Sequence, residues 1–328
     1  MPYISATPCL SDAFILTTLH PPARHRRTTL AVSHAGLLGS CTTLWWRPNH
    51  SRLPKSSCCA AGTPFRPPVS IYDEPGTATM ANTTSASTDQ ISELYDWTDE
   101  QCLAVYVFSF CHSLPCPSSL FIAIRRITRL RAALAAGAPK LGLVPTAELI
   151  ALNVLEFSPD DWVETYSLPI PEVAPVYALA FKLATVLYAL LSLPPPLSRP
   201  FAQHAILESS GGSGGISAAR IHYRKLLWNT IFFGERGLVP SPPGRMCWPL
   251  AVLGAACHDG TAQDHTAIVG LVKAMCGAPP IDCGPALLLE TLPRFWASGK
   301  TAWDDCFATP IHTWIWSISS YIIQMRMA

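Results

Sequence analysis

The chain has 328 residues, which is enough for one large domain or two small ones. Apolar residues make up 49% of it, charged residues only 14%, and the formal net charge is +1. This composition supports a sizeable core, excludes a wholly disordered chain, and gives no overall field that would attract nucleic acid or a membrane. The twelve cysteines include no C-x2-C pair. We therefore expect reduced thiols, several of them buried as small apolar groups, and no disulfide framework.

Residues 1–90 lack sustained periodicity and are rich in Ser, Thr, Pro, Ala and Arg. The cluster at residues 24–27 (Arg-His-Arg-Arg) is compatible with nuclear import or nucleic-acid contact, and an arginine-rich, acid-poor start is also typical of a mitochondrial transit peptide. The composition as a whole favours a disordered leader. Ordered structure is expected to begin near Ile91.

After this segment, apolar residues recur at helical spacing. Thr98, with acids in the first turn after it, predicts a helix start. Residues 120–134 predict an amphipathic helix with an apolar stripe at Ile124, Ile127 and either Leu130 or Leu134. Four arginines project elsewhere on that helix: Arg125, Arg126, Arg129 and Arg131. Such a run can face DNA, but no recognition fold surrounds it, so a solvated face is favoured. Residues 147–157 repeat the spacing, with Leu149, Leu152 and Leu155 as the apolar positions.

Residues 173–193 form the most apolar window and are long enough to span a membrane. Lys182 lies at its centre, where a charge costs roughly 2.5–3.5 kcal/mol on insertion. Prolines stand at both ends, and no strong basic bias fixes an orientation. A buried core helix is therefore favoured, and a membrane protein spanning at 173–193 is the alternative.

Residues 211–215 (Gly-Gly-Ser-Gly-Gly) formally fit G-x-S-x-G, the nucleophile elbow of serine hydrolases, with Ser213 as the nucleophile. That elbow needs a strand running directly into the turn, and the preceding residues are polar. Downstream acids and histidines leave a triad open by chain order. A flexible loop is favoured, and the hydrolase is the less favoured alternative.

Residues 216–233 predict a helix with Ile221, Leu226 or Leu227, and Trp228 facing inward. Residues 247–257 are apolar on nearly every side and predict an element that is buried all round. Two further periodic segments follow, and their apolar positions are Ile268, Leu271, Val272 and Met275 in the first and Leu288, Leu289, Leu292 and Trp296 in the second. His258 and His265 lie seven residues apart beside acids, but without standard ligand spacing. A helix cap at Asp259 or Asp264 with solvated histidines is favoured over a metal site.

Several of these segments resemble the fungal-specific transcription factor domain, the regulatory region of fungal Zn2Cys6 zinc-cluster regulators. A proline-broken entry precedes a helix that ends in Arg129, Leu130 and Arg131, and Tyr188 lies late in an apolar helix followed by proline. Further along the chain come Trp248, Pro249, Leu250 and Gly254, then Trp296, then Trp303. The resemblance covers residues 91–307.

The resemblance implies an all-α array of short packed helices and a nuclear role in RNA polymerase II transcription. Family members read DNA through a cluster of six cysteines that binds two zinc ions, and this sequence contains no such cluster. Zinc is therefore expected only if a cluster precedes these residues. We expect a regulatory module that is not an enzyme and has no catalytic, cofactor or metal residues. Its partners would be proteins, including a homodimer or heterodimer with another regulator, with DNA bound only indirectly.

The predicted organisation is a disordered leader over residues 1–90, a helical regulatory domain over residues 91–307 and an apolar tail over residues 308–328. The tail contains Trp314 and Trp316 and is too short to span a membrane. We therefore expect it to pack against the domain or lie at an interface.

Overall fold

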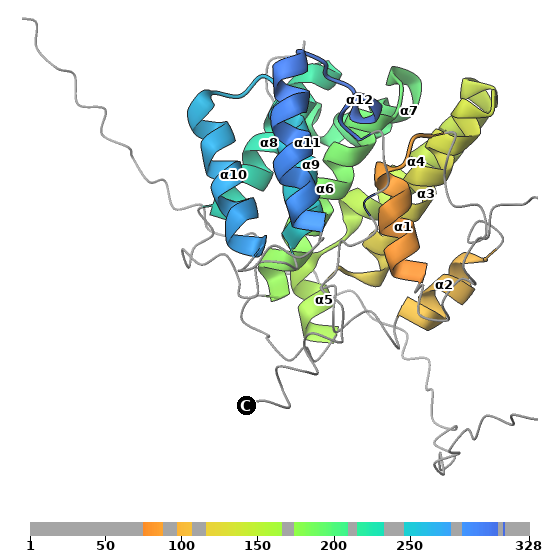
Figure 1. Ribbon diagram of the computed structural model, residues 1–328. Helices are drawn as coiled ribbons and strands as arrows, with labels where there is room; N and C mark the ends of the chain where they lie inside the picture. Colours follow the sequence, from red (N-terminus) through yellow and green to blue (C-terminus); the bar gives the residue numbers. More distant parts are fainter. Residues whose placement is uncertain are drawn as a thin grey trace, which may run out of the picture. The chain divides into compact units, whose positions relative to one another are not determined.

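The computed structural model describes residues 75–87, 97–106, 116–165, 174–208, 215–232, 246–276, 284–307 and 311. Within them, the regular elements are twelve helices, α1 to α12, and there is no strand (Figure 1). Contacts divide the chain into two units, residues 1–64 and 65–328, and all described residues belong to the second. The prediction of an all-α domain is confirmed.

The helix bounds match most of the predicted segments. They are α1 Pro75–Thr84, α2 Asp99–Val105, α3 Ser118–Ala135, α4 Lys140–Glu156, α5 Pro159–Thr165, α6 Ala174–Ser192, α7 Pro195–Glu208, α8 Ile216–Phe232, α9 Cys247–Ala256, α10 Ala262–Cys276, α11 Gly284–Ser298 and α12 Trp303–Cys306.

Helix α6 forms the centre of the domain. It packs against α3, α4, α5, α7, α8, α9 and α12. By length and hydropathy it is the one helix in the described part of the chain that could cross a membrane, but 78% of its apolar window is buried against the rest of the protein. Because neighbouring helices surround it, the structure supports the core-helix interpretation over the membrane span.

Helix α9 is the second element buried on all sides. All ten of its residues are buried, as the sequence predicts. It packs against α6, α8, α10 and α11. Figure 1 shows α10 and α11 on one side of the domain, away from α3 and α4.

Basic side chains cap the C-terminal ends of helices to which they do not belong. Lys182 on α6 donates to two backbone carbonyls at the end of α4, both at 2.8 Å. Arg220 on α8 donates to the carbonyl of Leu190 near the end of α6, at 2.9 Å. Arg224, also on α8, donates to the carbonyl of Ala256 at the end of α9, at 3.1 Å. The last carbonyls of a helix lack partners and carry partial negative charge, so a cation there satisfies both. These three basic side chains therefore link pairs of helices to each other.

Specific residues set the start of α2 and the end of α3. Thr98 forms a capping box with Gln101, which confirms the predicted start of α2. After α3, Gly137 has φ of 86°, and its N–H donates to the carbonyl of Leu134. Glycine adopts this left-handed conformation without a Cβ clash, so α3 ends in a Schellman motif.

Two helices present a different face from the one predicted. On α4, Leu149 and Leu152 are 54% and 51% exposed, and the buried residues are Ala147, Ile150, Ala151 and Val154. On α8, Ile221 and Leu226 are exposed; Leu227 is buried, and Trp228 is partly buried. The residues that pack inward on α8 are Ala219, Tyr223, Leu227 and Ile231. Two of the inward residues on α4 are alanines, whereas Tyr223 and Ile231 face inward on α8, so side-chain size alone does not decide which face of a helix packs.

The predicted boundary of the leader is too late. Helix α1 lies inside residues 1–90, and its residues Met80 and Ala81 are fully buried. Helix α1 contains few large apolar residues, so its sequence shows little helical periodicity. Its packing against α3 places it in the domain. Residues 1–74 and the serine-hydrolase candidate Ser213 lie outside the described residues, as does the tail apart from Ile311.

Alkaline pH is expected to destabilise the fold through its buried thiols. Six cysteines among the described residues are buried. Burial raises the pKa of Cys257 to about 12 and also raises the pKa values of Cys116 and Cys306. Above an unfolded pKa of 9.0 the unfolded chain releases thiol protons that the folded chain keeps, so the free energy of unfolding falls as pH rises. We expect a loss of about 1.4 kcal/mol per such thiol by about pH 10.

Urea unfolding near pH 8 and near pH 10 measures this loss. The Cys257→Ala variant should lose less stability than the original chain between the two values, because it lacks one of the titrating thiols. Burial lowers the pKa of Lys182, which adds stability toward high pH and opposes the thiols. Identical losses for the variant and the original chain would contradict the assignment to Cys257.

Candidate functional site

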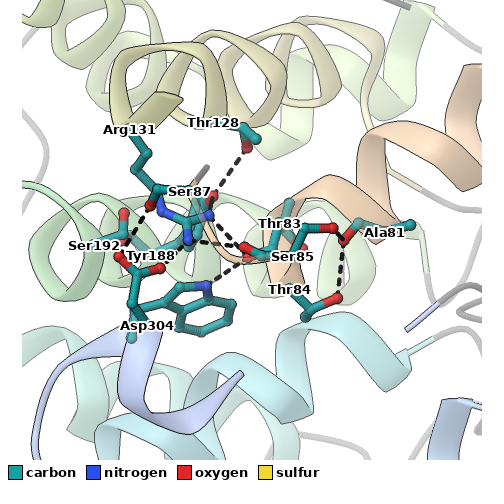
Figure 2. A network of polar contacts seen from close by, with 11 residues as sticks. Ala81, Thr83, Thr84, Ser85, Ser87, Thr128, Arg131, Tyr188, Ser192 and Asp304 are labelled. Atoms are coloured by element: carbon teal, nitrogen blue, oxygen red, sulfur yellow. Dashed lines mark hydrogen bonds and ion pairs between the residues drawn. The ribbon is translucent and has the colours of Figure 1, made fainter. Parts of the chain in front are cut away.

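The last turn of α1 meets α3, α6, α9 and α12 in a cluster of polar and aromatic side chains (Figure 2). We call this the Tyr188 cluster. Its members are Thr83, Ser85, Thr128, Arg131, Tyr188, Trp248, Trp303 and Asp304. It brings together four of the residues that carry the family resemblance, from four separate helices.

Arg131 is the charged member of the cluster and is 2% exposed. Its guanidinium donates to the carbonyl of Thr83 at 3.0 Å and to the carbonyl of Ser85 at 3.3 Å. It also donates to the hydroxyl of Tyr188 at 2.8 Å and forms an ion pair with Asp304. A buried guanidinium is stable only with such partners, so Arg131 fixes α1 and α12 against α3 and α6.

Tyr188 lies at the centre of the cluster and is fully buried. Its hydroxyl is 2.9 Å from the hydroxyl of Thr128, and Arg131 lies 5.7 Å from its ring centre. Burial raises the pKa of Tyr188, and the positive charge of Arg131 partly opposes that rise. The phenol is therefore neutral at physiological pH and serves as a hydrogen-bonding group.

Two buried tryptophans, one on α9 and one on α12, hold the end of α1 through hydrogen bonds. Trp248 on α9 donates its indole N–H to the Thr83 hydroxyl at 3.1 Å, and Trp303 on α12 donates to the Thr83 carbonyl. The Tyr188 ring meets both edge-on, at 5.9 Å from Trp248 and 4.9 Å from Trp303. A buried indole N–H needs an acceptor, and Thr83 supplies acceptors for both.

The segment after α1 is held at two further points. Ser87 donates to the Asp304 carboxylate at 3.0 Å, and the N–H of Ile311 donates to the hydroxyl of Thr84 at 2.9 Å. Residues from both ends of the described chain therefore meet at this cluster. Figure 2 shows Thr83, Thr84 and Ser85 grouped on the α1 side of it.

Arg129 and Leu130, predicted with Arg131 as one motif, point elsewhere. Leu130 is buried in the core. Arg129 donates to the carbonyl of Trp97 at 2.9 Å and lies 3.6 Å from the Asp99 carboxylate. Arg126 donates to Asp99 at 2.7 Å. The arginines of α3 therefore hold the start of α2.

The predicted solvated arginine face is wrong. Arg125 is 5% exposed and Arg131 is 2% exposed. Hydrophobic periodicity cannot predict that these arginines are buried, because a charged residue on an apolar face is read as a break in the apolar pattern. Carboxylate and carbonyl partners from distant segments make its burial possible.

The remaining motif residues form a second contact between α9 and α11. Pro249 and Leu250 are buried in α9. A Cβ added at Gly254 would lie 2.6 Å from a terminal methyl of Leu292. Trp296 donates its indole N–H to the Gly254 carbonyl at 2.9 Å. Gly254 therefore allows α11 to approach the backbone of α9 closely.

Replacing Gly254 with alanine is expected to destabilise the domain by about 1–3 kcal/mol. Alanine has the higher helix propensity by roughly 1 kcal/mol, but its methyl group would overlap the buried Leu292. The free energy of unfolding in urea measures the effect.

Two controls isolate the overlap. Gly270→Ala on α10 meets nothing within 4 Å and should stabilise the domain by roughly 0.5–1 kcal/mol. In a Leu292→Ala background, Gly254→Ala should become neutral or stabilising. A stabilising Gly254→Ala in the original chain would contradict the close contact.

The histidine and acid segment forms caps and contacts. The N-cap of α10 is Thr261 and not the predicted Asp264: the Thr261 hydroxyl accepts from the N–H of Asp264 at 3.2 Å, and the Asp264 carboxylate accepts back from the N–H of Thr261 at 2.8 Å. His265 stacks on Trp296 at 3.8 Å, so the prediction that it is solvated is wrong. Asp259 pairs with Arg224. Across the described ranges, no group of three or more His, Cys, Asp or Glu side chains is arranged to hold a metal ion.

Sequence reasoning missed four residues that complete the Tyr188 cluster: Thr83, Ser85, Thr128 and Asp304. Their hydrogen-bonding partners come from segments up to 220 residues apart in sequence, such as Thr83 and Trp303. The available signal was a Thr-Thr-Ser run at residues 83–85 in a segment predicted to be disordered. Hydroxyl side chains that bond back to carbonyls one turn earlier can stay buried inside a helix end.

The distinctive residues of this all-α domain join its helices to one another, and the fold by itself does not assign a function. The family model described as the fungal specific transcription factor domain matches residues 77–279, which is more than half of the chain. The chain therefore belongs to this family and is a transcription regulator by family. No curated protein and no solved structure matches the chain.

The match begins and ends earlier than the predicted range of 91–307. It starts within α1 and stops between α10 and α11. Trp296 and Trp303 thus lie outside the matched residues, although both contact residues within them.

Proposed function

We propose that this domain is the regulatory part of a nuclear regulator of RNA polymerase II transcription, and that it acts through protein partners or a bound effector without reading DNA itself. The match to the transcription factor domain over residues 77–279 carries the proposal. Transcription factors act in the nucleus, and the nuclear location proposed here follows from the family.

The arginines of α3 support a role that does not read DNA. A DNA-reading helix presents its basic side chains to phosphates and base edges in the major groove. Here Arg125 and Arg131 are buried, and Arg126 and Arg129 are paired with Asp99. These cations hold helices together, so α3 offers no free basic face of the kind that DNA recognition requires.

A tethering experiment tests the regulatory role. The full 328-residue chain, fused to an unrelated DNA-binding domain, should change transcription of a reporter that carries the matching sites. The matched control is the Tyr188→Ala fusion, which removes the centre of the Tyr188 cluster and should lose the effect at equal protein level. A correctly expressed original fusion with no effect on the reporter would overturn the proposal.

A binding experiment tests the second half. Fluorescence anisotropy of the unfused chain with a pool of duplex DNA should show only weak, salt-sensitive binding without sequence preference. Nanomolar, sequence-specific binding that survives physiological salt would show that these residues read DNA themselves.

A further inference from the structure

Asp304 on α12 connects the hydroxyl of Ser87 to the buried guanidinium of Arg131 (Figure 2). Ser87 follows the end of α1, is partly exposed, and donates its hydroxyl proton to one carboxylate oxygen of Asp304 at 3.0 Å. The other carboxylate oxygen pairs with Nη2 of Arg131. A charge added to Ser87 therefore acts directly on the ion pair that links α12 to α3.

The guanidinium of Arg131 uses only part of its capacity to bind an anion. Nη1 donates to Thr83 and Tyr188, and Nη2 donates to Ser85 and Asp304. Nε lies on the same edge of the planar guanidinium as Nη2, and it is buried without an acceptor among the described residues. An anion can accept from both nitrogens of such an edge at once, whereas Asp304 accepts from only one.

A phosphate on Ser87 would compete with Asp304 for this edge. It carries nearly two negative charges and three acceptor oxygens at neutral pH. It would lie beside the Asp304 carboxylate, because the two side chains are already hydrogen-bonded, and the two anions repel each other. Arg131 is 2% exposed and needs an anion, whereas the Asp304 side chain is 49% exposed and can be solvated by water. Asp304 is therefore the group that leaves.

The sequence around Ser87 indicates the class of kinase that fits it. Residues 67–124 contain no lysine or arginine, and acids follow Ser87 at Asp89 and Glu93. A kinase that selects basic residues near its target finds none here, and the residue after Ser87 is not proline. A kinase with basic groups beside its active site is complementary to these acids.

We propose that Ser87 is a phosphorylation site for an acid-directed protein kinase, and that its phosphate replaces Asp304 as the partner of Arg131. In the transfer, the Ser87 oxygen bonds to the γ-phosphorus of ATP, the bond from that phosphorus to ADP breaks, and the hydroxyl proton passes to the catalytic carboxylate of the kinase. Helix α1 then stays attached to α3 through Arg131. Helix α12 loses its links to Ser87 and Arg131 and keeps the hydrogen bond from Trp303.

The inference does not rest on the regulatory role proposed above. Its tests measure phosphate transfer and the opening of α12, whereas the tethering experiment measures transcription of a reporter. A failure of one therefore leaves the other unaffected.

Hydrogen exchange of the full chain tests the displacement of Asp304. With phosphoserine introduced at position 87 by codon reassignment, residues 303–307 should exchange about tenfold faster than in the unmodified chain. Residues 75–84 should keep their protection, because Arg131 still holds α1. Ser87→Ala removes only the hydrogen bond and should accelerate exchange less than about threefold. Asp304→Ala should reproduce the tenfold increase, and phosphoserine in that background should add nothing further.

Phosphorus NMR tests the contact between the phosphate and Arg131. The second pKa of phosphoserine is about 6, and a cation beside the phosphate favours the dianion. We expect this pKa to be about one unit lower in the folded phosphoserine chain than in the same chain unfolded in urea. Equal values in the two states would contradict the contact.

Mass spectrometry tests the modification itself. After incubation of the full chain with an acid-directed kinase and ATP, phosphate should be found on Ser87, and the Ser87→Ala chain should lack that phosphopeptide. Circular dichroism confirms that each chain is folded. A chain that gains no phosphate at Ser87, or a phosphoserine chain whose residues 303–307 exchange no faster than those of Ser87→Ala, would overturn the proposal.

Discussion

Arg131→Met is expected to lower the free energy of unfolding by about 2–4 kcal/mol. Methionine replaces the aliphatic stem of the arginine but lacks the guanidinium, so it carries no charge and donates no hydrogen bond. The buried carbonyl of Ser85 then loses its donor, and the hydroxyl of Tyr188 keeps only Thr128 as a partner. Each buried polar group left without a partner costs about 1–3 kcal/mol. The Asp304 side chain is 49% exposed, so water can solvate it when its partner is gone.

Hydrogen exchange locates the damage. Because Arg131 holds the last turn of α1, residues 75–87 should lose protection in the variant beyond what the global loss of stability explains. Residues 303–307, which include Asp304, should lose protection with them.

Arg126→Met is the matched control, since it removes an arginine from the same helix. The Arg126 side chain is 36% exposed and pairs with Asp99, so we expect a loss of less than about 1 kcal/mol. Equal losses for the two variants, or unchanged protection at residues 75–87, would contradict the role given to Arg131.

Trp248→Ala is expected to lower the free energy of unfolding by about 3–5 kcal/mol. The indole is 1% exposed, lies parallel to the Phe181 ring at 5.9 Å, and contacts the Tyr188 ring edge-on. Alanine would leave a cavity between α6 and α9, the two helices that are buried most completely. Urea and thermal unfolding measure the loss.

Two further variants separate packing from hydrogen bonding. Trp248→Phe retains a ring but loses the N–H that Thr83 accepts, and we expect a loss of about 1–2 kcal/mol. Trp228→Ala on α8 removes a partly buried indole that stacks on Phe232, and it should cost less than Trp248→Ala. If Trp228→Ala were the more damaging change, the central place of Trp248 would be refuted.

The helices themselves were predictable because their signals are local. Residues 120–134 alternate at helical spacing, and the structure places α3 over Ser118–Ala135. Apolar content alone predicted that residues 247–257 are buried on all sides, and every residue of α9 is buried. Prolines and capping residues end these segments, and those act within one turn.

The inward face of a helix was predicted less well. The sequence analysis predicts Leu149 and Leu152 as apolar positions of α4, but Ala147 and Ala151 face the neighbouring helices instead. The choice depends on how closely those helices approach, which no property of α4 alone decides.

The sequence by itself determined the all-α class and the positions of most helices, and the family resemblance included Arg131, Tyr188, Trp248 and Trp303 among its ten motif residues. Only the tertiary structure decided that these four residues meet around Thr83 at the end of α1. The physical reason is the separation along the sequence between the residues that interact. Helix formation follows from residues within one or two turns, whereas a buried arginine needs partners from distant segments, and those partners leave no periodic pattern in the sequence.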